Sequence, residues 1–297
     1  MPFSAGGGAL RGRLARLGPA LDTILDDQHG YPEPVGALLA ETMAVASVLA
    51  ASLKYDGIFT LQAQGSGPVT LLVADVTSDG HIRAHARFDA ERVAGLAVEA
   101  HASVPKLLGE GHLAFTVDQG ADTERYQGIV ALEGDTLEEC ARSYFRQSEQ
   151  LDTAIEVAVS EPTAGRGWRA GALMIQRMPA NSANAPIMMA EDAEEFWNRA
   201  AILLGSVTAA ELLDPDLAPE RLLHRLYHAE QLQAFDPKAL IAKCRCSRDK
   251  VEGALRSIPL DEALGLIDAE GQLVVTCEFC CAAHIFVPAD LERLHAS

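Results

Sequence analysis

Cysteines are concentrated at one end of this chain, and their spacing limits what that end can fold into. Five of the six cysteines lie in the last 54 of the 297 residues. Four of them form two close pairs, Cys244-x-Cys246 and Cys277-x-x-Cys280, separated by 30 residues. Two close thiol pairs far apart in sequence are how four sulfurs converge on a tetrahedral Zn²⁺ ion, whereas iron–sulfur sites favour other spacings. The pattern predicts a centre in which these four cysteines bind one zinc ion per chain.

The segment that carries these cysteines offers only a small core. Its apolar residues are few (Leu255, Ile258, Leu264, Leu266, Ile267, Val274, Ile285 and Phe286). A unit of about 60 residues usually needs a disulfide or a structural metal to fold. Zinc binding supplies a free energy on the order of 10–16 kcal/mol. Each thiol pair can also close as a disulfide, which binds zinc poorly because the ligand must be a thiolate. Oxidation would then expel zinc and unfold the tail, although the spacing alone favours a purely structural zinc site.

Basic side chains surround the first cysteine pair, at Lys243, Arg245, Arg248 and Lys250. These charges would favour the thiolate form and raise its reactivity towards oxidants. Compensation of the negative charge of a zinc tetrathiolate explains them equally well. The sixth cysteine, Cys140, stands alone within a predicted helix, and we expect it to be a small buried apolar residue.

Residues 1–179 are predicted to form an α+β core. Helices are expected over 19–29, 34–56 and 136–150, the last with a capping box between Thr136 and Glu139. Strand-like alternation recurs over 58–62, 69–73, 82–87, 113–117, 126–130, 154–159 and 169–175. Because most strands are consecutive, we expect antiparallel pairing. The first residues, with Gly6-Gly7-Gly8, are expected to form a short flexible tail that leads into the first strand or helix.

Beyond Met178-Pro179 the composition changes. Residues 180–190 are small and polar, and 191–233 have a helical, acidic pattern, with nine acidic and three basic residues between 181 and 234. Their apolar residues form two stripes (Phe196, Ala200, Leu203, Leu204 and Val207; Leu222, Leu223, Leu226 and Tyr227). Short helices need a partner surface because they are marginal alone. We therefore divide the chain into a core (1–179), a helical linker (180–234) and a zinc-binding domain (235–297).

Charge and hydropathy exclude several classes of partner. The chain has 42 acidic and 24 basic residues, a formal charge of −18, which argues against binding to nucleic acid or an anionic membrane surface. We find no apolar run of 18 residues and no signal-peptide pattern. Cysteines clustered in the tail of a long chain without a signal are typical of metal binding or redox chemistry in the cytoplasm, where we expect this protein.

No catalytic set is evident, and we expect that the protein is not an enzyme. His224 and His228 have the spacing of a metalloprotease pair, but Arg225 stands where the general-base glutamate is needed. Gly65-Ser66-Gly67 lacks the lysine of a phosphate-binding loop and is expected to be a hairpin turn. We find neither a Ser-His-Asp arrangement nor a nucleophile elbow.

Several ordered blocks resemble one known family, the redox-regulated holdase chaperones known as 33-kDa heat-shock proteins or 33 kDa chaperonins. The resemblance covers nearly the whole chain and includes the cysteine set. It is carried by YPEPV (31–35), LKYDG (53–57), QGSGP (64–68), ERYQG (124–128), LEGDT (132–136), YF (144–145), QSEQ (147–150), IQRMP (175–179), RLYH (225–228) and Cys244-x-Cys246…Cys277-x-x-Cys280.

The resemblance implies a stress-activated chaperone that works without ATP. In such proteins the reduced, zinc-bound form is inactive. Oxidants with unfolding stress convert the four cysteines to disulfides, here Cys244–Cys246 and Cys277–Cys280, and release zinc. Tail and linker then unfold, and the exposed apolar surface holds unfolding client proteins. The oxidised form is commonly a homodimer, which hands clients to ATP-dependent foldases.

Two departures from the family pattern concern the second cysteine pair. Cys281 stands where the family usually has glycine, and it could compete as a ligand or disulfide partner. His284 could replace a sulfur ligand, but we favour Cys280 because C-x-x-C closes a zinc knuckle with ordinary geometry. The alternatives to the holdase are a constitutive zinc-stabilised adaptor without a redox switch and, less favoured, a zinc or thiol enzyme.

Overall fold

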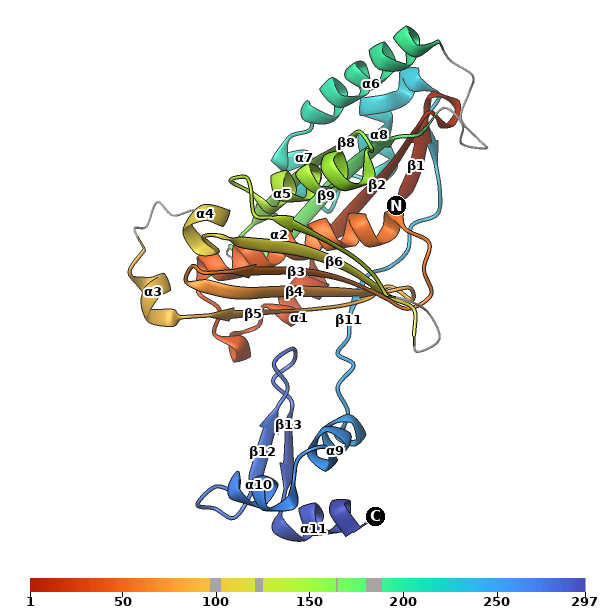
Figure 1. The fold of residues 1–297 in the computed structure, drawn as a ribbon. Coiled ribbons are helices and arrows are strands. Elements are labelled where there is room, and N and C mark those ends of the chain that lie inside the picture. Colours follow the sequence, from red (N-terminus) through yellow and green to blue (C-terminus); the bar gives the residue numbers. More distant parts are fainter. Residues whose placement is uncertain (97–102, 121–124, 164, 180–188, 297) are drawn as a thin grey trace. The chain divides into compact units, whose positions relative to one another are not determined.

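Figure 1 shows the computed structural model, which describes residues 1–96, 103–120, 125–163, 165–179 and 189–296. Contacts divide the chain into two compact units. One comprises Met1–Asp26 and Gly30–Ala242, and the other comprises Asp27–His29 and Lys243–Ser297. Helices and strands are mixed throughout, which confirms the predicted α+β class.

The first unit contains two sheets. The first sheet has the order β10-β1-β2-β9-β8 (Gln233–Ala234, Pro2–Ala5, Leu10–Leu17, Arg169–Arg177, Thr153–Ser160). The second sheet has the order β11-β5-β4-β3-β6-β7 (Ile241–Ala242, His81–Phe88, Val69–Thr77, Ile58–Gly65, Gly111–Asp118, Tyr126–Ala131). All pairs are antiparallel, as predicted, except that the short β11 runs parallel to β5. The turn at Gly65-Ser66-Gly67 joins β3 to β4, which confirms the predicted hairpin.

Helix α2 (Glu33–Ser52) lies between the two sheets (Figure 1) and is buried on nearly every side. Its contacts reach β4 and β5 of the second sheet and β2, β8 and β9 of the first. A helix that is apolar all round belongs in the core of a large domain. By length and composition it is the one helix of the described chain that could cross a membrane, but 89% of its apolar window is buried in the fold.

The prediction of a flexible amino-terminal tail was wrong, because the first residues build two strands of the first sheet. Strand β2 lies between β1 and β9, and Phe3, Leu10 and Leu14 are buried. Gly6–Gly8 form the connecting 3-10 turn (η1), with positive φ angles of 58°, 63° and 101° that favour glycine. Three arginines of β2 (Arg11, Arg13 and Arg16) concealed its buried face in the sequence.

Helix α5 (Leu137–Tyr144) begins differently from the prediction. Thr136 accepts a hydrogen bond from the Glu139 amide at 3.2 Å, but the Glu139 carboxylate accepts from the Asp135 amide, so the predicted capping box is only half formed. The buried Glu41 of α2 accepts hydrogen bonds from two amides at the start of α5, and the nearer one, that of Leu137, lies at 2.9 Å. Burial raises the pKa of Glu41 to about 7.

Other predicted helix limits differ slightly from the structure. The helix predicted over 34–56 ends at Ser52, because the following residues turn into β3, and the helix predicted over 19–29 is α1 (Pro19–Ile24) followed by a 3-10 turn (Asp27–His29). The helix predicted over 136–150 continues past α5 as a π-type turn over Phe145–Glu149. The same unit has two short helices, α3 (Ala90–Ala94) and α4 (Val104–Leu107).

The acidic helices pack on the first sheet, on the face opposite α2. They are α6 (Ala190–Gly205), α7 (Ala209–Leu213) and α8 (Pro219–Tyr227), followed by a 3-10 turn (His228–Glu230). Their apolar stripes form a second core with the sheet (Phe3, Ala5, Leu10, Leu14, Leu173, Ile175, Phe196, Ala200, Leu204, Leu212, Leu222, Leu223, Leu226 and Tyr227). The first sheet is thus the partner surface that these helices need. The predicted start of the linker, residues 180–188, lies outside the described residues.

The second unit holds a hairpin and three helices. They are β12 (Leu273–Thr276), β13 (Ala283–Phe286), α9 (Arg248–Arg256), α10 (Leu260–Gly265) and α11 (Pro288–Ala296). Six apolar residues are buried (Leu255, Ala263, Leu273, Phe286, Leu291 and Leu294). Leu266, Val274 and Ile285, expected in this core, are 59%, 46% and 47% exposed. Val274 pairs with Ile285 on the outward face of the hairpin, because side chains alternate along a strand.

Candidate metal centre

Two tight backbone segments bring the four predicted thiols together. Cys277 follows β12, and its carbonyl accepts hydrogen bonds from the amides of Cys280 (3.4 Å) and Cys281 (2.8 Å). This turn places Cys280 beside Cys277. Cys244 and Cys246 precede Ser247, whose side chain caps α9. The sequence therefore carries one pair on a hairpin turn and the other directly before a helix.

The four sulfurs form one compact group. The Sγ atoms of Cys244, Cys246, Cys277 and Cys280 all lie within 4.8 Å of one another. The Sγ–Sγ distance is 3.7 Å between Cys244 and Cys277 and 3.4 Å between Cys246 and Cys280. Four metal–sulfur bonds of about 2.3 Å in a tetrahedron place the sulfurs about 3.8 Å apart. The group therefore fits a tetrahedral metal ion bound by four thiolates.

The electrostatics of the group also favour a cation. Burial raises the pKa of Cys244, but the Cys246 amide, 3.4 Å from its sulfur, and the neighbouring thiols lower it to a net value of about 7. Burial and the neighbouring thiols raise the pKa of Cys280, and burial together with Cys244 and Cys277 raises that of Cys246. Four thiolates so close together repel one another, and a divalent cation among them would remove that repulsion.

The basic residues around the first pair have different roles. The Arg248 guanidinium donates to Glu252 (3.1 Å), to the Ile285 carbonyl (2.9 Å) and to Asp290 (3.3 Å). It also lies 4.2 Å from the centre of the Phe286 ring. Arg248 thus ties α9 to β13 and α11. Lys250 donates to the Arg245 carbonyl at 2.7 Å and so braces the loop that carries the first pair.

Cys281 and His284 lie outside the group of four ligand atoms. The backbone of Cys281 is left-handed, with φ of 55°, a conformation that costs an L-residue energy and that glycine adopts freely. The glycine usual in the family thus suits the geometry of this turn. His284 lies on β13 opposite Val275.

The remaining chemical candidates are not brought into a common site. Cys140 is fully buried in the core of the first unit, as predicted, and burial raises its pKa to about 11. The rings of His224 and His228 stack at 5.2 Å on the exposed side of α8. The sequence did not reveal the hydrogen bond from the Cys246 amide to the Cys244 sulfur two residues away. The role of Arg248 depends on tertiary contacts with β13 and α11 that no sequence spacing reveals.

Comparisons with known proteins agree over nearly the full length of the chain. The family model described as "Hsp33 protein" matches residues 1–287. A "33 kDa chaperonin" of Caulobacter vibrioides is 38% identical over 274 residues, which cover 91% of this chain and 88% of the relative. One of Pseudomonas paraeruginosa is 39% identical over 288 residues, which cover 97% and 91%.

A solved structure shares the fold. The crystal structure of the 33 kDa chaperonin (heat shock protein 33 homolog) from Thermotoga maritima superposes with a TM-score of 0.81 at 22% identity. The match covers 99% of this chain and 97% of that one. At this identity the likeness concerns the fold alone.

Proposed function

The chain belongs to the Hsp33 family, and from this membership we propose that it is an ATP-independent holdase chaperone activated by oxidation. The observation that carries the proposal is the group of four Sγ atoms within 4.8 Å in a unit with only six buried apolar residues. A core this small depends on a bound metal for its stability. Loss of the metal would therefore unfold the unit.

The bound metal is proposed to be zinc, held by Cys244, Cys246, Cys277 and Cys280 in the reduced form. Zinc would supply fixed tetrahedral geometry and charge compensation without redox chemistry of its own. Oxidation removes two electrons from each thiol pair, forms one S–S bond, and reduces one hydrogen peroxide to two waters. Two such reactions consume all four ligands.

The pairing Cys244–Cys246 and Cys277–Cys280 is proposed from the family. Sγ–Sγ contacts of 3.7 Å and 3.4 Å instead join the two halves of the group, Cys244 to Cys277 and Cys246 to Cys280. All four sulfurs are close enough to exchange partners after a first disulfide forms. Mapping of disulfide-linked peptides from the oxidised protein would decide between the two pairings.

Client binding is proposed to follow release of the acidic helices. The first sheet buries Phe3, Leu10, Leu14, Leu173 and Ile175 beneath α6–α8. Undocking of these helices would expose a broad apolar face, which suits a binder of many unfolded chains. Residues 1–179 would then act as the binding core, 180–234 as the detachable linker and 235–297 as the redox switch. A homodimer of the oxidised form, transfer of clients to ATP-dependent foldases, and a cytoplasmic location complete the proposal.

The test joins metal release to chaperone activity. Peroxide is added to the reduced, zinc-loaded protein with a chromogenic chelator, while light scattering of a heated client is followed in the same cuvette. We expect one zinc per chain to be released as holding activity rises. Cys246→Ser should lose zinc without oxidant, and Cys140→Ala, which removes a thiol outside the centre, should respond as the unaltered protein does.

Two outcomes would reject the switch. Reduced protein that protects the client as well as oxidised protein would show that activity does not need oxidation. Zinc that stays bound under peroxide, or leaves without a gain in activity, would make the centre structural and favour the constitutive adaptor.

A further inference from the structure

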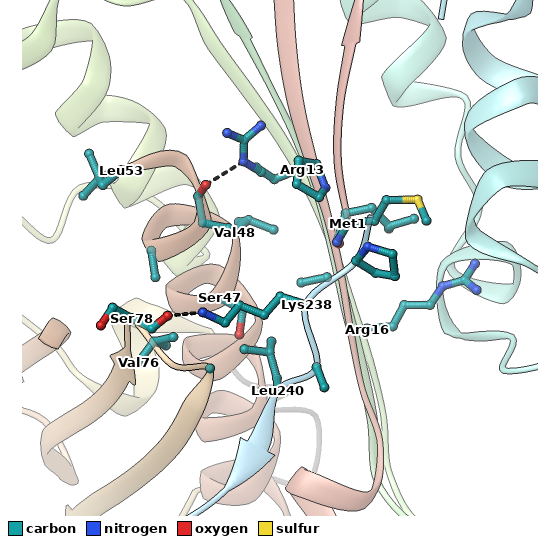
Figure 2. Close-up of a pocket in the computed structure, with 18 of the residues that line it drawn as sticks. Met1, Arg13, Arg16, Ser47, Val48, Leu53, Val76, Ser78, Lys238 and Leu240 are labelled. Atoms are coloured by element: carbon teal, nitrogen blue, oxygen red, sulfur yellow. Dashed lines mark hydrogen bonds between the residues drawn. The ribbon is translucent and has the colours of Figure 1, made fainter. Parts of the chain in front are cut away.

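A cavity of about 590 Å³ lies in the first unit, where the amino-terminal hairpin, the end of α2 and the segment 235–240 meet. Figure 2 shows it, with Val48 of α2 between Arg13 and Lys238. Apolar side chains form much of its wall (Val48, Leu53, Val76 and Leu240). The volume falls within the range of sites for small organic ligands.

The charge of the cavity is opposite to that of the protein. The chain carries a formal charge of −18, yet the lining includes Arg13, Arg16, Lys54 and Lys238 and no aspartate or glutamate. Several arginines elsewhere are paired with carboxylates, as Arg83 is with Asp75 at 2.8 Å. A concentration of cations without carboxylates marks a place for an anion.

The cations of the lining are bound to backbone oxygens. Arg13 donates to the carbonyl of Ala51 at 2.6 Å and to that of Gly12 at 2.7 Å, and Lys238 donates to the Ser78 carbonyl (Figure 2). Neither has a carboxylate within 4.0 Å in the described part of the chain. Burial, and next the charge of Arg11, lower the pKa of Arg13.

Donors remain available for a ligand. Lys54 is exposed at the rim and makes no hydrogen bond to any residue that the structure describes. One terminal nitrogen of Arg13 and the other protons of Lys238 are also available. The Arg16 guanidinium is turned away to the carbonyls of Glu211 and Leu217, so Arg16 contributes its aliphatic stem.

We propose that this cavity is a binding site for a small aliphatic carboxylate. The carboxylate would lie among Arg13, Lys54 and Lys238, and its chain would lie against Val48 and Leu240. Cations alone would accept any anion, but the apolar walls select one with a hydrocarbon body. Inorganic phosphate, which lacks such a body, should bind weakly.

The ligand would also hold down the segment that forms one side of the cavity. The Phe235 amide donates to the Pro2 carbonyl and the Ile241 amide to the Gly80 carbonyl, each at 3.0 Å. A ligand that binds only the closed segment stabilises it by mass action. This step rests on the proposed function: since the segment leads directly to Cys244, a bound carboxylate would favour the resting form.

The test is calorimetric titration of the reduced, zinc-loaded full chain with octanoate, 1-octanol and inorganic phosphate. We expect octanoate to bind one per chain and at least tenfold more tightly than octanol or phosphate. Lys54→Gln and Lys238→Gln should each weaken octanoate binding at least tenfold. Lys106→Gln, an exposed lysine of α4 outside the cavity, is the matched control and should bind as before.

Several results would overturn the site. They are no binding of octanoate at millimolar concentration, equal binding of octanol, or an equal loss in the Lys106→Gln control. The effect on the segment is read separately, as slower hydrogen exchange of the Ile241 amide with octanoate present, and unchanged exchange would refute the coupling. No client or oxidant is present, so these results do not depend on whether the chain is a redox-activated holdase.

Discussion

Replacement of Cys281 by glycine should stabilise the metal-binding unit. The residue holds a left-handed backbone, with φ of 55°, while its amide donates to the Cys277 carbonyl at 2.8 Å. That conformation costs an L-residue about 1–2 kcal/mol, and the greater freedom of glycine in the unfolded chain offsets about 0.5–1 kcal/mol. The net gain is about 0.5–1 kcal/mol, which corresponds to about 2–8 °C in the midpoint of a small unit.

The assay is a thermal scan of the reduced, zinc-loaded protein in which a chelator reports metal release. Cys281→Ala is the matched control, since it removes the thiol but keeps the Cβ atom that the left-handed backbone disfavours. We expect the midpoint to rise for glycine and to stay near the original for alanine. Equal midpoints for the two variants would refute the backbone argument and assign the effect to the thiol.

Three further substitutions test the first unit. Burial raises the pKa of Glu41 to about 7 from the ordinary value of 4.5, so the folded state holds the extra proton and stability falls as pH rises between these values, by up to about 3 kcal/mol. Glu41→Gln should flatten that slope in urea unfolding at pH 5 and pH 8, and parallel slopes would contradict the assignment. Phe3→Ala removes a fully buried ring and should cost about 3–5 kcal/mol in urea unfolding, so a loss below 1 kcal/mol would show that the second core is loose. Gly171→Ala places a Cβ 2.8 Å from Leu212 of α7, which should loosen that helix and increase holding activity at a given peroxide dose. Gly253→Ala places its Cβ in open space and should not increase the activity. Equal responses of the two variants would disprove helix release as the limiting step.

Local signals predicted much of this structure. The alternation over 58–62 and 69–73 identified strands because each has one buried face, and the two cysteine pairs identified the grouped thiols because metal ligands follow fixed spacings. Strand β2 was missed because its arginines do not mark a solvent face. Arg13 donates to the carbonyl of Ala51 at the end of α2, and Arg16 donates to carbonyls of α7 and of the α7–α8 connection.

Other features depend on tertiary contacts alone. In the sequence, Glu41 interrupts an apolar run. In the structure, its carboxylate accepts hydrogen bonds from backbone amides nearly a hundred positions away. The outward direction of Val274 and Ile285 depends on the register of a hairpin, which composition does not fix. The cavity likewise joins Arg13, Lys54 and Lys238 from three distant segments.

The order of strands in the first sheet has a consequence for synthesis on the ribosome. Strand β2 pairs along its whole length with β9, from Leu10 opposite Arg177 to Leu17 opposite Ala170. This pairing cannot form until β9 has been synthesised. At about 5–20 residues per second this delay is roughly 8–30 s. Until then the first sheet is incomplete, and the apolar side of α2 that packs against it remains exposed. The nascent chain then resembles the unfolded proteins that its family protects. Ribosome-bound chains stalled before β9 should therefore be open to protease along α2, and chains released after β10 should resist.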